Sequence, residues 1–460
     1  MTSPGPLSIT RTLSAYVAGA LAADPPASHR ELGRLHILDT LAAMVACRDL
    51  EPALLARNYA LSLSGPCGTT TMLATNERAG LVDAAFASAM TGHAAEINDF
   101  IPSAFVQPGP AVVSVTLALA ETRGASGADL LRAVMAGYEL AGRLPKALGL
   151  ANLRRAGVAN HGIGPLFGSA AAAAALLRLT PAQVDDVWTF CAQQAGGSWQ
   201  WLLDVEHIEK AFVFAGMGAR DGLHATLMVE AGFRGVRQAL DHPAGWLHGG
   251  VFAGGDSNHA YLVEGLGQRS ELPLTAYKRY PVGGPTQPAV EALLSLLPAI
   301  AGAPVEAVKI EMPGRWEAFR DAAMPALNLR YLTAIILLDG RLDFVSAQSL
   351  ERMAGDEGVR ALMDRVKIAH DPAQEARPGE PRTESARVSV RLEGGRDVHA
   401  YTPHVLGFPS HPMTAADVEA KALDLMAPHL GVARAKAVIE AVRGIEHMAA
   451  ARDLIALIAR

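Results

Sequence analysis

The chain has 460 residues, a length that predicts two or three domains rather than one compact core. Half of the residues are hydrophobic and 19% are charged, which excludes a disordered chain. The net charge of -6 offers no basic surface for nucleic acid or an anionic membrane. Cys47, Cys67 and Cys191 are odd in number and lack metal-binding spacing, so we expect neither a disulfide framework nor structural zinc.

The N-terminus, MTSPGPLSITRTL, has no basic segment followed by an apolar one, and polar residues interrupt the longer apolar stretches. We therefore expect neither a signal peptide nor a membrane span. With its few cysteines, the chain is predicted to be cytoplasmic and to act on a small molecule.

Helical patterns fill most of the first 267 residues. In residues 29–47, apolar side chains recur at steps of three and four, as in a helix with one buried face. Thr180 followed by Pro181 is typical of an N-cap and a first helical position. Similar helical patterns occupy residues 81–97, 109–121, 127–148, 162–179 and 222–233.

Strand patterns appear in the next segment. Residues 305–312 alternate between apolar and polar side chains, and residues 387–402 have the pattern of a hairpin that turns at Gly394 and Gly395. Helices are expected at residues 288–297 and 327–339. This segment is therefore predicted to be a small α+β domain.

The chain becomes helical again near its end, with Thr414 as a predicted N-cap. We predict a mostly α fold in which residues 1–267 and 406–460 build a large all-helical domain. Residues 268–405 form a smaller α+β lid domain inserted into it.

The sequence contains no Walker A loop, HExxH motif or EF-hand loop, and its glycine groups do not join a strand to a helix. We therefore predict no metal and no cofactor. Any reaction would depend on acid/base and charged side chains.

The first polar group lies in residues 92–110, where Glu96, Asp99, Ser103 and Gln107 would share one face of a helix. Pro102 argues against a continuous helix there. The alternative is that Asp99 and Ser103 only cap the next element.

Other candidates stand apart along the chain. His161 precedes a glycine-rich turn that opens a helix, although a lone histidine is more often structural. Lys210 and Arg220 flank an apolar stretch and could equally be solvated charges.

Lys278 and Arg279 lie in a proline-rich loop, and Tyr331 could be simple core packing. Together the candidates provide cations, an imidazole, a carboxylate and hydroxyls. Such a set suits a polycarboxylate substrate, because cations hold carboxylates and stabilise an enolate.

Six collinear segments resemble the MmgE/PrpD family along nearly the whole chain: GHAAEINDF with a downstream QPG, NHGIGPLFGSAAAAAA, KAFVFAGMGARDG, YKRYPVGGPTQPAVEALL, LRYLTAIILLDG and PMTAADVEAK. The family includes 2-methylcitrate dehydratase, cis-aconitate decarboxylase and iminodisuccinate epimerase. The resemblance implies the same two-domain fold, a homodimer and a cofactor-independent site in the cleft between the domains.

Matched residue by residue, Asp99 falls on an Asp of the family's AAHxxDxDD segment, and Ser103 on the hydroxyl residue after it. His161 matches the His of a GxHPT-like turn, Lys278 the Lys of the KxYP loop and Tyr331 a helical Tyr.

Several positions depart from the family pattern. Lys210 lies one residue farther from Gly216 than the lysine of the KxxHxG pattern. Glu96, Gln107 and Gln287 stand where the family often has histidine, and Ile101-Pro102 replaces paired acids. At Gln107 and Gln287 an amide, which only forms hydrogen bonds, replaces an imidazole that titrates near neutrality.

The resulting hypothesis is a lyase that labilises a C–H bond beside a carboxylate. Lys210 and Lys278 bind carboxylates, His161 carries the proton, Asp99 is a second acid/base or orienting group, and Tyr331 serves the leaving group.

Ser103, Gln107, Arg279 and Gln287 are assigned to substrate binding. Dehydration of a 2-methylcitrate-like hydroxy acid ranks first, and epimerisation or decarboxylation are alternatives. A non-catalytic dimeric binding protein is the competing class.

Overall fold

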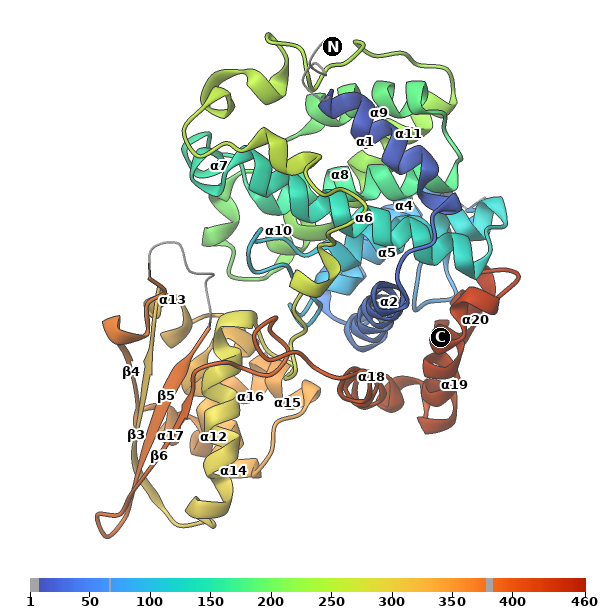
Figure 1. The fold of residues 1–460 in the computed structure, drawn as a ribbon. Helices are drawn as coiled ribbons and strands as arrows, with labels where there is room; N and C mark the ends of the chain where they lie inside the picture. Colours follow the sequence, from blue (N-terminus) through green and yellow to red (C-terminus); the bar gives the residue numbers. More distant parts are fainter. Residues whose placement is uncertain (1–7, 66–67, 378–383) are drawn as a thin grey trace.

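The computed structural model describes residues 8–65, 68–377 and 384–460; Cys67 lies outside these ranges. Helices dominate, and one small sheet lies in a separate unit below the helical part (Figure 1). This confirms the predicted fold class. Among the described helices, none combines the length and the apolar character needed to cross a bilayer.

The helical domain is built from both ends of the chain, with α18 and α19 lying beside α2 (Figure 1). Its helices are α1 (Ile9–Gly19), α2 (Ala27–Cys47), α3 (Glu51–Ser64), α4 (Leu81–His93), α5 (Pro108–Arg123), α6 (Gly127–Leu148), α7 (Leu150–Arg155), α8 (Asn160–Leu176), α9 (Pro181–Gln194), α10 (Ile208–Ala211), α11 (Met217–Glu230), α18 (Ala415–Leu430), α19 (Val432–Arg443) and α20 (Arg452–Ile458). A two-stranded ribbon, β1 (Thr70–Thr71) and β2 (Arg78–Ala79), lies between α3 and α4.

Small side chains let the central helices approach closely. Every residue of α8 is buried, and its alanine run packs against α6 and α11. A Cβ added at Gly168 would lie 2.7 Å from the carbonyl oxygen of Gly137 on α6. The alanine-rich sequence thus specifies a tightly packed helical core.

The small domain, which we define as α12 through β6, contains a four-stranded sheet of order β4-β3-β5-β6. Strand β3 runs parallel to β4 and antiparallel to β5, and β5 and β6 form the predicted hairpin, in which Gly394 and Gly395 have φ of 89° and 84°. The elements of the small domain are α12 (Gln287–Ile300), β3 (Val305–Met312), α13 (Glu317–Arg320), α14 (Leu329–Asp339), α15 (Phe344–Gln348), α16 (Leu350–Gly355), α17 (Glu357–Met363), β4 (Val366–His370), β5 (Ala386–Leu392) and β6 (Asp397–Thr402).

Both predicted N-caps are confirmed. The Thr180 and Thr414 side chains each accept a backbone N–H of the first turn, and Gln183 and Asp417 complete capping boxes. Strand β4 and the short helices α15 to α17 were not predicted.

The returning helix α18 is tied to α2 by a buried ion pair. Lys421 Nζ donates to Asp39 Oδ1 at 2.6 Å and to the carbonyl oxygen of Ile97 at 2.8 Å. Both charged side chains are buried, at 4% and 0% exposure. The pair therefore connects two segments 382 residues apart in the sequence.

We expect Lys421→Met to lower the free energy of unfolding by about 3–5 kcal/mol, because it leaves the Asp39 carboxylate buried without its partner. Arg443→Met, which removes the exposed pair with Glu419, serves as the control and should lower the free energy of unfolding far less, because solvent screens an exposed pair. Urea unfolding compares the two variants. Equal losses would contradict the structural role of Lys421.

Candidate active site

The main cavity lies between the helical domain and the small domain and has a volume of about 920 Å³. Its charged and imidazole-bearing lining residues are Glu96, Arg154, His161, Asp204, His207, Lys210, Lys278, Arg315, Glu317, Asp321 and Glu384. This position agrees with the cleft that the family resemblance implies.

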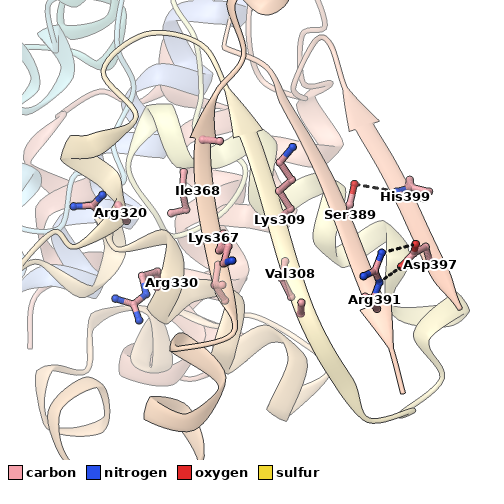
Figure 2. A pocket seen from close by; sticks show the side chains of 13 residues that line it. Val308, Lys309, Arg320, Arg330, Lys367, Ile368, Ser389, Arg391, Asp397 and His399 are labelled. Atoms are coloured by element: carbon pink, nitrogen blue, oxygen red, sulfur yellow. Dashed lines mark hydrogen bonds and ion pairs between the residues drawn. The ribbon is translucent and has the colours of Figure 1, made fainter. Parts of the chain in front are cut away.

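A second cavity, of about 640 Å³, lies on the open face of the four-stranded sheet (Figure 2). There Arg391 pairs with Asp397, and His399 contacts Ser389 (Figure 2). These groups satisfy one another across neighbouring strands, so we take the inter-domain cavity as the candidate active site.

Glu96 is the centre of the buried end of the cavity. It follows α4 in a loop, and its φ of 55° places it in the left-handed region that few residues other than glycine adopt. Its Oε1 lies 3.3 Å from Lys210 Nζ and 3.7 Å from His207 Nδ1. Burial alone would raise the pKa of this carboxyl, but the ammonium groups of Lys210 and Lys278 hold it well below its usual range.

Lys278 approaches Glu96 from the connection between the domains. Its Nζ donates to the carbonyl oxygen of Glu96 at 2.5 Å. Burial lowers the pKa of Lys278 to about 8, against the opposing effect of Glu96. Phe100 and Ala276 hold this connection through paired backbone hydrogen bonds of 3.0 and 2.7 Å.

Lys210 lies on α10, immediately before a π-helical turn at residues 212–216. A π turn takes one more residue than an α turn, and this one contains Gly216. The alternative that Lys210 is a solvated charge is wrong, because its ammonium contacts Glu96 and lies 5.7 Å from the Trp201 ring.

His161 lies in the first turn of α8, whereas the sequence predicted it just before that helix, and aromatic rings surround it. Its ring stacks on Phe214 at 3.9 Å and meets the edge of Trp201 at 5.0 Å. Burial lowers the pKa of His161 to about 3, so the ring is neutral near pH 7. Its Nδ1 is 3.1 Å from Gln107 Oε1. Because an amide oxygen only accepts, Nδ1 carries the proton and Nε2 keeps its lone pair.

Asp99 lies outside the cavity lining formed by the described residues. Its Oδ2 accepts a 2.6 Å hydrogen bond from Tyr138 and lies 2.9 Å from His36 Nδ1. Its Oδ1 accepts from the Gly109 N–H in the first turn of α5 at 3.3 Å, which fits the capping alternative for Asp99, whereas the N-cap residue of α5 is Gln107 and Ser103 is exposed. The acid beside Lys210 in the cavity lining is Glu96, so this geometry does not support a catalytic role for Asp99.

Four other predicted site residues are also outside that lining. Ser103 is exposed, Arg279 lies over Tyr280, and the Tyr331 hydroxyl donates to the Ser346 carbonyl in the core of the small domain.

Gln287 contacts backbone groups of its own loop, accepting from Tyr280 N and donating to the carbonyls of Tyr280 and Val282. A substrate contact at Ser103, Arg279, Gln287 or Tyr331 would require a different arrangement. The structure brings together Gln107, His161, Lys210 and Lys278.

Several lining residues were not predicted as site residues. His207 is the residue just before α10. Its position three residues before Lys210 is the sequence feature that could have indicated it as a site residue. Arg154, which lies 4.3 Å from the Trp199 ring, and Arg315 add cations from the two domains. Trp199 and Trp201 lie in a segment for which no element was predicted.

The cavity lining brings the His161 imidazole and the Lys210 and Lys278 ammonium groups together with carboxylates that include Glu96, a combination suited to proton transfer beside a carboxylate. The MmgE/PrpD N-terminal domain matches residues 11–258, and the MmgE/PrpD C-terminal domain matches residues 280–447. The chain therefore belongs to the MmgE/PrpD family, whose members include carboxylate-acting lyases.

Its relatives include decarboxylases. The cis-aconitate decarboxylase-like protein oryM of Aspergillus oryzae is 30% identical over 39% of this chain and 38% of its own length. Human cis-aconitate decarboxylase is 25% identical over 73% of this chain and 71% of its own. The Aspergillus terreus cis-aconitate decarboxylase is 27% identical over 50% and 48%, respectively. These identities support an enzyme of the family type but leave the reaction to be proposed.

We expect His161 to stay neutral down to about pH 4, because burial lowers its pKa to about 3 from the usual 6.5. NMR of ¹³C-labelled histidine would follow this titration, with His161→Gln identifying the signal. Trp201→Ala should raise the pKa toward 6.5 by opening the enclosure, whereas Trp201→Phe should leave it low. A wild-type midpoint near 6.5 would contradict the enclosure's effect.

Proposed function

We propose that the protein is a cofactor-independent lyase that removes a proton beside a carboxylate of a small di- or tricarboxylate, with dehydration of a 2-methylcitrate-like hydroxy acid as its reaction. The observation that carries this proposal is that His161, Lys210 and Lys278 line one cavity between the two domains.

In this mechanism, Nε2 of His161 accepts the proton from the substrate carbon, because Gln107 holds the proton on Nδ1. Lys210 and Lys278 stabilise the negative charge that moves onto the substrate carboxylate. The C–O bond then breaks, and Lys278 donates a proton to the departing hydroxide. A pKa of about 8 makes Lys278 a suitable acid near neutrality.

Decarboxylation of a cis-aconitate-like acid is the second candidate, favoured by the names of the three relatives. It needs a donor that protonates the carbon after CO₂ leaves. The low pKa of His161 does not suit that donor role, so Lys210 or Lys278 would have to supply the proton.

Incubation in heavy water with a panel of hydroxy, amino and unsaturated di- and tricarboxylates, followed by NMR, separates these reactions. Loss of an α-proton with formation of an alkene supports dehydration. Release of labelled CO₂ from cis-aconitate supports decarboxylation, and deuterium exchange with inversion supports epimerisation. Tight binding of a carboxylate without any turnover or exchange would overturn the enzyme proposal and favour a binding protein.

We expect His161→Gln to reduce turnover by about 10²–10⁴-fold, the usual effect of losing a general base. Lys210→Met should mainly lower kcat, because the ammonium acts on charge that develops in the transition state. Arg220→Met is the matched control, since Arg220 pairs with Asp221 and lies outside the proposed machinery. Equal losses in all three variants would point to a general structural effect instead.

The pH profile should show a basic limb near pH 8. Lys278 is charged below its pKa of about 8, so activity that needs its ammonium falls as the pH rises through that value. Lys278→Arg stays charged to much higher pH but does not release its proton near neutrality, so it should remove this limb and also reduce the rate by losing the proton donor. An unchanged limb in that variant would assign it to another group.

A homodimer and a cytoplasmic location remain part of the proposal. Light scattering of the purified chain tests the dimer.

A further inference from the structure

His93, Glu96 and His207 form a second cluster at the buried edge of the cavity. One nitrogen from each ring and one carboxylate oxygen lie within 4.8 Å of one another. Glu96 and His207 line the cavity, and His93, the last residue of α4, lies behind them with its side chain fully buried.

The far nitrogen of each ring is fixed by a hydrogen bond. His93 Nδ1 donates to Asn98 Oδ1 at 2.8 Å, and His207 Nε2 donates to the His93 carbonyl at 2.9 Å. Amide and carbonyl oxygens only accept, so the protons sit on these nitrogens. The lone pairs of His93 Nε2 and His207 Nδ1 therefore belong to the cluster.

These two nitrogens have no hydrogen-bond partners among the described residues, and solvent does not reach them, because the His93 and His207 residues are only 0% and 4% exposed. An unpaired buried polar atom is costly, so a native structure normally satisfies it. Histidines that bind metals typically donate their other ring N–H to an oxygen acceptor, which fixes the tautomer and the ring orientation. Both rings have this arrangement.

We propose that His93 Nε2, His207 Nδ1 and a Glu96 carboxylate oxygen form a binding site for a divalent cation of the zinc class. Two imidazole nitrogens and one carboxylate suit Zn²⁺, Co²⁺ or Ni²⁺, whereas magnesium and calcium prefer oxygen ligands. The remaining coordination position would face the cavity, because Glu96 and His207 both line it.

The cation would compete with Lys210. The Lys210 ammonium lies 3.3 Å from the same Glu96 oxygen that is 3.7 Å from His207 Nδ1. Two positive charges at one oxygen repel each other, so binding of the cation displaces the ammonium. The site therefore opposes the ion pair used in the proposed reaction, and the binding proposal itself does not depend on that reaction.

The test uses the full chain, treated with chelator and titrated with Co²⁺ by visible absorption and with Zn²⁺ by calorimetry, without substrate. We expect one cation per chain. His207→Ala and Glu96→Gln should each weaken binding about 100-fold, and Asn98→Ala should weaken it about tenfold by freeing the His93 ring. Lys210→Met should tighten binding about tenfold by removing the competing charge.

His248→Ala is the matched control, because His248 contacts His259 outside the cavity. It should leave the affinity unchanged, and melting temperatures establish that each variant is folded. Absence of a bound cation, or binding that persists in folded His207→Ala and Glu96→Gln, would overturn the proposal. Neither result would alter the substrate experiments, so the two proposals fail separately.

Discussion

The ion pair between Lys210 and the Glu96 carboxylate, which is 13% exposed, is the interaction on which the site depends. A charge in a mostly apolar cavity is costly unless opposite charges and hydrogen bonds compensate it. Here Lys210 faces the carboxylate and Lys278 binds the carbonyl of the same residue. One residue thus positions two ammonium groups, and the left-handed backbone at Glu96 is the strain that accompanies this arrangement.

The two cations arrive from different parts of the fold, which couples the site to the contact between the domains. Lys210 is placed by the π turn before α11, and Lys278 by the connection into the small domain. That connection is hydrogen-bonded on both sides, to Phe100 and, through Tyr277, to Gly407. The small domain therefore helps to complete the charge balance of the cavity as well as covering it.

Features that depend on local sequence were predictable, and those that depend on irregular backbone were not. The N-caps at Thr180 and Thr414 and the hairpin β5–β6 follow from short-range chemistry. Strand β4 has only five residues, two of them exposed, which is too short for a clear strand pattern. Its extended conformation depends on pairing with β3. Periodicity could not show that Glu96, rather than Asp99, faces the cavity, because no helix spans that loop.

The imidazoles show how one site can support two kinds of chemistry. Hydrogen bonds fix the proton on Nδ1 of both His161 and His93, and on Nε2 of His207, so each ring directs a lone pair inward. Burial keeps all three rings neutral by lowering their pKa values. A lone pair of this kind accepts a proton from carbon when substrate is adjacent, and it can equally bind a cation. The position of the Lys210 ammonium distinguishes the two kinds of chemistry. Beside Glu96, as in this structure, it supports proton transfer, whereas binding of a cation requires it to move away.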